Sequence, residues 1–252
     1  MTTKTNFECV CEFNETFDFP VFSFEMQPLV NQLKVSQYRF DLIHEEGVEE
    51  FGIALHNNDY VEMLDAVADH LYVLYGACHT FNINPDFYIR TTYSKLPLNS
   101  HDSPTKLIFE LFNPQVTIQE LHRLNIFYEQ MLHNAMIVEK NIMNTHTILM
   151  NMIVNTYKIG FHLTSDIDGA FLNVHQSNMS KLCTSIEEAE ATVKSYEEKF
   201  KSGNSPYDTP YYYELKPNLY VVKNKSTGKA LKSINYTAAS PSQFLFDEFK
   251  KS

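Results

Sequence analysis

Two acidic clusters stand close together in the first third of this 252-residue sequence. The first is an E-E-x-x-E-E pattern that runs from Glu45 to Glu50, and the second places Glu62, Asp65 and Asp69 at steps of three and four residues. Side chains three and four positions apart share one face of an α-helix. Each cluster therefore predicts an acidic stripe on a helix, and carboxylate oxygens are the ligands that Mg²⁺ prefers.

The elements that would carry these stripes form a predicted helical hairpin. Apolar residues recur at helical spacing over residues 28–56, and Asp59 is placed to cap a second helix over residues 59–81. The second helix is apolar on nearly every face, which is typical of a buried helix, and it contains no lysine or arginine. Two helices joined by a short turn pack antiparallel, so the stripes could face each other.

The acids of the second helix need a partner if they are buried. An unpaired buried carboxylate costs several kcal/mol even after the protein relaxes. The acids must therefore face either water or cations. For residues 45–50 alone, a solvated helix face remains an open interpretation, whereas the two stripes at hairpin spacing favour a metal site.

Composition narrows the classes of function. The formal net charge of −11 disfavours binding to a nucleic-acid backbone. The chain has only 7 glycines and no Gly-rich phosphate loop, so a Rossmann or P-loop fold is not expected. Four cysteines show neither a disulfide framework nor a second C-x-C pair for zinc. No signal peptide and no apolar run of about 20 residues occurs, which predicts a soluble, cytoplasmic protein with no membrane contact.

The remaining elements are predicted from periodicity and turn residues. We expect irregular chain over 88–116, a long helical pattern over 117–157, helices over 166–182 and 185–200, and a β-hairpin that turns around 226–228. The last of these helices begins with a potential capping box, Ser185 to Glu188.

The acidic hairpin resembles the MazG-like all-α nucleoside triphosphate pyrophosphohydrolases. Their pattern is E-E-x-x-E on one helix and E-x-x-D on the next. Glu45 to Glu49 matches the first part as it stands, but a second register uses Glu46 and Glu50 and puts Gly47 where the family has a glutamate. Both registers stay open. Glu62-x-x-Asp65 matches the second part, and Asp69 lies where some members place their aspartate.

Two later motifs resemble the phosphoribosyl-ATP pyrophosphohydrolase-like branch of this superfamily. One is H-x-S-N-M-S-K, which begins at His175, and the other is the G-K-x-L-K-x-x-N-Y ending, which begins at Gly228. Taken singly, each lysine is ordinarily a solvated surface charge, and the histidine and tyrosine are ordinarily packing residues. Together and in order, the motifs imply these substrate-binding residues: His175, Asn178, Lys181, Lys229, Lys232, Asn235 and Tyr236.

The resemblance implies an all-α helical bundle with a small C-terminal β-hairpin, in one domain over residues 1–252, with a helical insertion over residues 88–165. It implies a homodimer or a dimer of dimers. The implied reaction is (d)NTP + H₂O → (d)NMP + pyrophosphate, with Mg²⁺, or alternatively Mn²⁺, activating a water that attacks the α-phosphorus. The expected metal ligands are Glu46, Glu49, Glu50, Glu62, Asp65 and Asp69, and the catalytic residues are expected among Glu45, Glu46, Glu49 and Glu50.

Three alternatives remain from the sequence. The first is a dUTP-specific or phosphoribosyl-ATP-specific hydrolase of the same fold. The second is a catalytically inactive helical interaction module, to which the departure at Gly47 gives weight. The third is a structural bundle that binds metal. The base and the sugar of a nucleotide substrate are not indicated by any motif.

Overall fold

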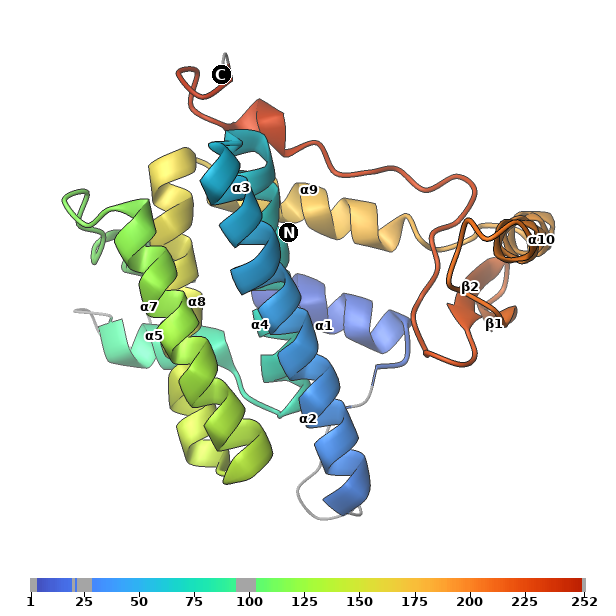
Figure 1. The fold of residues 1–252 in the computed structure, drawn as a ribbon, viewed down its shortest axis with the longest axis horizontal. Helices are drawn as coiled ribbons and strands as arrows, with labels where there is room; N and C mark the ends of the chain where they lie inside the picture. The colour runs from blue at the N-terminus through green and yellow to red at the C-terminus, as the bar shows by residue number, and fades with distance from the viewer. Residues whose placement is uncertain (1–3, 20, 22–28, 94–102, 251–252) are drawn as a thin grey trace.

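The computed structural model describes residues 4–19, 21, 29–93 and 103–250. It is mostly helical with one two-stranded antiparallel sheet, so the predicted all-α bundle with a small C-terminal hairpin is confirmed. Figure 1 shows the bundle and, beside it, a smaller lobe that holds the sheet. Among the described residues, no helix is long and apolar enough to cross a membrane.

The acidic hairpin forms as predicted, with one change. Helix α2 (Leu29–His44) runs into a π-helical segment, η1 (Glu45–Glu50), and then into α3 (Phe51–Asn57). The chain turns at Asn58, whose φ of 55° is left-handed, and Asp59 caps α4 (Tyr60–Thr80) by accepting a hydrogen bond from the Glu62 backbone at 3.1 Å. The π-helical segment changes which glutamates share a face, so the α-helical spacing expected for residues 45–50 is wrong.

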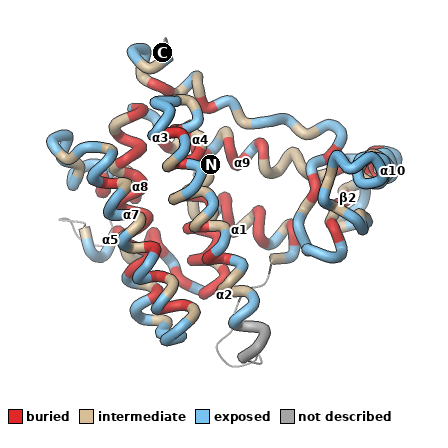
Figure 2. Tube along the Cα trace, viewed as in Figure 1, coloured by how far each residue is buried: buried red, intermediate tan, exposed pale blue. Residues whose placement is uncertain are grey.

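Helix α4 forms the centre of the bundle. It packs against α1 (Asn6–Thr16), α8 (Ile142–Leu163) and α9 (Ile167–Met179), and Figure 2 shows its buried residues enclosed by these neighbours. The side chains of Tyr75 and Tyr157 are fully buried, and their hydroxyl groups lie 3.0 Å apart. An apolar helix with few solvent-facing positions is therefore buried, as its composition predicts.

The segment expected to be irregular is partly helical. It contains α5 (Pro85–Tyr93) and α6 (Pro104–Phe109), while residues 94–102 lie outside the described chain. The long helical pattern that follows is two helices rather than one: α7 (Ile118–His133) continues into the π-helical η2 (Asn134–Val138), and α8 begins after a turn at Lys140, whose φ is 54°. Helices α7 and α8 pack on each other, and α8 joins the same hydrophobic core as α4.

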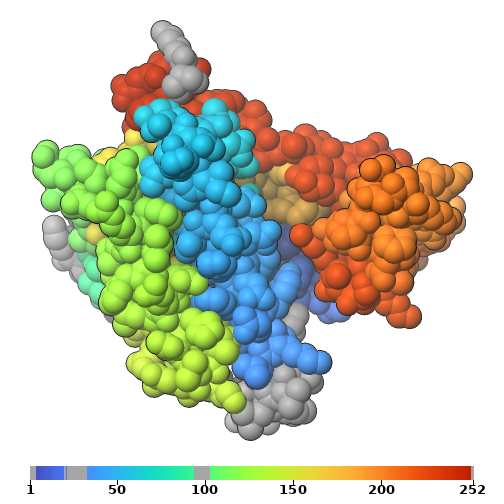
Figure 3. Space-filling view, in the orientation of Figure 1, coloured from blue at the N-terminus to red at the C-terminus, as the bar shows by residue number. Residues whose placement is uncertain are grey.

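The C-terminal lobe, residues 183–236, has a small core of its own. Helix α10 (Ile186–Lys201) packs on strands β1 (Pro210–Lys216) and β2 (Leu219–Asn224) around Cys183, Tyr220 and Leu231. Figure 3 shows this lobe projecting from the side of the bundle. The chain then returns along α9 to a short 3₁₀ helix, η3 (Pro241–Phe244).

The hairpin turns at a different place from the one predicted. The strands connect through Pro217 and Asn218, and Asn218 adopts the required left-handed φ of 61°. Ser226 to Gly228 instead form a second turn, in which the Gly228 N–H donates to the Asn224 carbonyl at 2.7 Å. The predicted Ser185 cap is present, but Glu188 completes no reciprocal box, because its carboxylate accepts from Thr184.

Candidate active site

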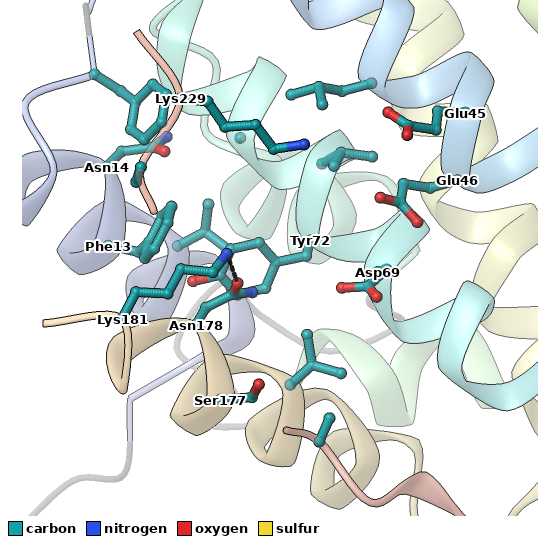
Figure 4. Close-up of a pocket in the computed structure, with 18 of the residues that line it drawn as sticks. Phe13, Asn14, Glu45, Glu46, Asp69, Tyr72, Ser177, Asn178, Lys181 and Lys229 are labelled. Atoms are coloured by element: carbon teal, nitrogen blue, oxygen red, sulfur yellow. Dashed lines mark hydrogen bonds between the residues drawn. The ribbon is translucent and has the colours of Figure 1, made fainter. Parts of the chain in front are cut away.

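A cavity of about 430 Å³ lies between the bundle and the C-terminal lobe. Helix α1, the α2–η1 segment, α4 and α9 form its sides, and the chain that follows β2 closes it (Figure 4). Nine of the residues predicted to form a site line it: Glu45, Glu46, Asp65, Asp69, Asn178, Lys181, Lys229, Lys232 and Tyr236. Folding therefore brings together two acidic helices and three lysines that are distant in the sequence.

The acidic wall consists of Glu45 and Glu46 from η1 and Asp65 and Asp69 from α4. Glu46 Oε2 and Asp65 Oδ1 are buried and accept no hydrogen bond from the described residues. Burial, and then the nearby charges of Asp69 and Glu50, raise the pKa of Glu46 to about 9. Burial, and then the charge of Asp65, raise the pKa of Asp69 to about 7. These carboxylates are crowded together, which disfavours their full ionisation without a cation.

The other glutamates of the first cluster take different places. Glu50 lies close enough to raise the pKa values of both Glu46 and Asp69, although it does not line the cavity. Glu49 is exposed, and its Oε1 lies 3.5 Å from His44 Nε2. Glu62 is exposed and does not line the cavity, but its charge helps to raise the pKa of Asp65. The arrangement favours the register that uses Glu46 and Glu50.

The space beside Gly47, where the second register would have a glutamate, is filled by the side chain of His70. A Cβ atom at this position would overlap the imidazole of His70, which occupies the space that a larger residue would need. The other ring nitrogen of His70 lies 3.1 Å from the Thr156 hydroxyl, and burial lowers the pKa of this histidine to about 3. A neutral histidine therefore packs where the family pattern has a glutamate.

The basic wall consists of Lys181 at the end of α9 and Lys229 and Lys232 after β2. Lys181 Nζ donates to Asn178 Oδ1 at 2.6 Å, and burial, together with the charges of the two other lysines, lowers its pKa to about 8. Burial disfavours charge on Lys229, but Tyr207, Glu45 and Tyr38 outweigh this effect and raise its pKa.

No ion pair is present between the two walls among the described residues. In Figure 4, Lys181 and Lys229 instead point into the space in front of Glu45, Glu46 and Asp69. The cavity therefore presents opposite charges on its two sides without joining them.

Two predicted substrate-binding residues do not line the cavity. His175 is buried behind its wall, where Nδ1 lies 3.1 Å from the Tyr72 hydroxyl and Nε2 lies 3.5 Å from Glu12 Oε2. Asn235 lies beside Glu188 on α10. Tyr236 does line the cavity, and its hydroxyl lies 2.8 Å from Ser177 Oγ.

Comparison with known proteins matches the segment that contains the acidic hairpin to a known family. Residues 10–92 match the family described as phosphoribosyl-ATP pyrophosphohydrolase. An uncharacterized protein of Acanthamoeba polyphaga mimivirus is 32% identical over 238 residues, which cover 91% of each chain. Residues 10–92 are a phosphoribosyl-ATP pyrophosphohydrolase domain, which is part of the MazG-like nucleotide pyrophosphohydrolase superfamily. No solved structure matches it significantly.

The MazG-like match covers α2, η1, α3 and α4, and therefore the whole acidic wall. All three lysines lie outside the matched residues, as do Asn178 and Tyr236. The mimivirus protein extends across nearly the full length of the chain, so its similarity is not confined to the matched hairpin. The presence of this domain supports an assignment of the protein as a hydrolase that acts on nucleotide pyrophosphate bonds.

The acidic wall fits a divalent cation that arrives with its substrate. Among the described residues, no three His, Cys, Asp or Glu side chains converge on one point. Mg²⁺, however, is usually bound through one or two carboxylates together with substrate phosphates, rather than by an all-protein cage. Glu46 and Asp65 each offer a buried carboxylate oxygen without a hydrogen-bond partner, and Asp69 lies beside them, so the donor set is compatible with such a cation.

Several cavity residues were missed by the sequence analysis. They are Phe13, Asn14, Tyr38, Arg39 and Tyr72. Arg39 lies seven residues before Glu46 on α2, which is helical spacing, but no motif distinguishes it or Tyr38 from the other residues of this helix. Phe13 and Asn14 come from α1, which carries no motif and meets α4 only in the folded chain.

Proposed function

We propose that this protein is a Mg²⁺-dependent nucleoside triphosphate pyrophosphohydrolase that converts (d)NTP and water to (d)NMP and pyrophosphate. The carrying observation is that four carboxylates and three lysines face one another across a single cavity without forming ion pairs. A metal–triphosphate complex matches both walls, because it presents positive charge to the acids and phosphate oxygens to the lysines.

We assign the acidic wall to the metal. Glu46, Asp65 and Asp69 would hold Mg²⁺ or Mn²⁺, with Glu50 close behind them. When bound, the ion supplies neutralisation of the triphosphate and a more acidic water. A cation here would offset both the burial and the repulsion that raise the pKa values of Glu46 and Asp69, so both side chains would be ionised in the loaded site.

Glu45 is our candidate for the general base. It lines the cavity on the same segment as Glu46 and is exposed, so a water molecule can reach its carboxylate and give up a proton to it. On the opposite wall, Lys229 and Lys232 would bind the oxygens of the departing pyrophosphate, and Lys181 would be held in place for the same purpose by Asn178.

The position of water attack provides the decisive test. The protein should be incubated with each common (d)NTP and Mg²⁺ in H₂¹⁸O, and the products separated and weighed by mass spectrometry. Attack at the α-phosphorus places ¹⁸O in the monophosphate and leaves pyrophosphate unlabelled. Label in pyrophosphate, or release of orthophosphate with a diphosphate, contradicts the proposal. Phosphoribosyl-ATP and dUTP belong in the same screen, since turnover of one of them alone would identify a specialised hydrolase.

A further inference from the structure

The cavity has a second end, away from the acids. Helix α2 places Arg39 about two turns before Glu46, and the antiparallel α4 places Gly76 about two turns after Asp69. Arg39 faces Gly76, because a Cβ atom on that glycine would lie 2.8 Å from Nη1 of the arginine. At about 1.5 Å per residue, the arginine end lies roughly 10 Å along the helices from the acidic end.

Arg39 is buried with hydrogen-bonding capacity to spare. Its side chain is only 4% exposed, and Nε donates to Thr80 Oγ1 at 2.8 Å. The guanidinium carbon lies 5.3 Å from the centre of the Phe19 ring and 5.8 Å from that of Tyr38. Nη2 has no hydrogen-bond partner among the described residues. Since an unpaired buried donor is costly, this group is suited to an acceptor supplied by a ligand.

Tyr38 offers a flat surface beside that donor. Its side chain is 37% exposed and lines the cavity. The charges of Lys229 and Glu45 act on its hydroxyl, which places the ring between the arginine end and the charged walls. Aromatic rings of this kind bind nucleobases by stacking, whatever the base.

We propose that the arginine end of the cavity binds the nucleobase and selects bases that present a carbonyl oxygen. A guanidinium only donates hydrogen bonds, so it suits the O6 and N7 acceptors of guanine or hypoxanthine. The amino group of adenine would place a donor against a donor. The base assignment rests on the proposed function, because it concerns the other end of the same substrate.

The test compares two nucleotides that differ only in this exocyclic group. With ITP and ATP as substrates, kcat/KM for ITP should be higher by about tenfold or more, which is the usual discrimination of a paired arginine–base contact. Arg39→Gln should shift the preference toward ATP, because glutamine can pair with both N6 and N7 of adenine. Arg39→Lys should lower the preference without reversing it. Tyr38→Leu should weaken both substrates equally and leave their ratio unchanged.

Three results would overturn the base assignment: equal turnover of ITP and ATP, a preference for ATP in the parent protein, or an unchanged ratio in a folded Arg39→Gln variant. If that variant does not fold, as judged by circular dichroism, the ratio in the parent protein decides. If neither nucleotide is hydrolysed, the proposed function fails and calorimetric titration with IMP and AMP decides the base assignment. Tighter binding of IMP would support it, and equal binding or none would refute it.

Discussion

The two walls of the cavity are built in different ways. The acidic wall belongs to α4 and the α2–η1 segment, which are part of the main hydrophobic core. Two of the three lysines follow β2 in the C-terminal lobe, which has a small core of its own and joins the main core through Val221. The packing of the main core fixes the positions of the acidic residues before any ligand binds. The positions of Lys229 and Lys232 depend instead on how the lobe packs against the bundle.

Both walls carry unfavourable charge when the cavity lacks a ligand. Burial, and then repulsion from neighbouring carboxylates, raise the pKa of Glu46 to about 9, while burial and neighbouring lysines lower that of Lys181 to about 8. A metal–triphosphate complex would relieve both at once. We therefore expect changes to the acidic wall to affect chemistry most, and changes to the lobe to affect mainly nucleotide affinity.

The largest effect should follow loss of a carboxylate from the acidic wall. Asp65→Asn and Glu46→Gln should each lower kcat by at least about a hundredfold, because removal of one group that stabilises transition-state charge commonly costs that much. Glu49→Gln is the matched control, since Glu49 is exposed and lies beside His44 rather than in the cavity. Steady-state release of pyrophosphate measures all three. A hundredfold loss in Glu49→Gln would favour the register that uses Glu49, and normal turnover in Asp65→Asn would remove Asp65 from the site.

Metal binding should stabilise the acidic wall without nucleotide. At a Mg²⁺ concentration about a hundredfold above its dissociation constant, the native state gains about 2.7 kcal/mol, or roughly 5–10 °C in Tm for a chain of this size. Differential scanning fluorimetry with Mg²⁺ and with EDTA measures this shift. The Glu46→Gln, Asp65→Asn double variant should lose it. An undiminished shift in that variant would place the ion elsewhere.

A smaller effect is expected from the lobe. The Lys229→Ala, Lys232→Ala double variant should raise KM for nucleotide by about tenfold and lower kcat less, because both side chains are exposed and screened by solvent. Lys216→Ala with Lys225→Ala removes the same charge from the lobe outside the cavity. If the two double variants behave alike, the effect is one of net charge and not of contact with phosphate.

The sequence predicts helix caps and buried helix faces better than it predicts where helices break and strands turn. The Asp59 cap and the buried character of α4 are confirmed, because both depend on neighbouring residues alone. The hairpin turn was misplaced because Gly228 suggested the position, whereas Asn218 adopts the left-handed conformation between the strands. The break at Lys140 was missed for a similar reason, since no glycine or proline marks it.

For the candidate site, charge spacing pointed to the acidic residues of both helices but could not say which of Glu45 to Glu50 line the cavity. The π-helical segment turns Glu49 outward, and α-helical periodicity cannot reveal such a segment. Motif resemblance found Lys181 and Tyr236, yet it also pointed to His175, which lies behind the wall against Tyr72. Arg39 carries no motif, and its missing hydrogen-bond partner is visible only once its burial is known.

The smallest predicted effect is on the pH dependence of stability. It tests whether ionisation of the buried acidic wall is unfavourable in the absence of a cation. Glu46 has a folded pKa of about 9 against an ordinary 4.5, so between these values the folded protein holds more protons than the unfolded chain. Stability must then fall as pH rises through this window. Asp69 acts in the same direction up to a pH of about 7.

His70 and Lys181 limit the pH range over which the effect of Glu46 on stability can be measured. His70, with a folded pKa of about 3, makes stability rise with pH up to its ordinary 6.5, and Lys181 does the same above a pH of about 8. Between pH 7 and 8, without metal, the parent protein should lose about 1.4 kcal/mol relative to Glu46→Gln, or roughly 3–6 °C in Tm. Mg²⁺ should abolish this difference, because the ion holds the carboxylate in its charged form. Parallel Tm curves for the two proteins in EDTA would show that Glu46 is already ionised, and that the acidic wall does not require a cation.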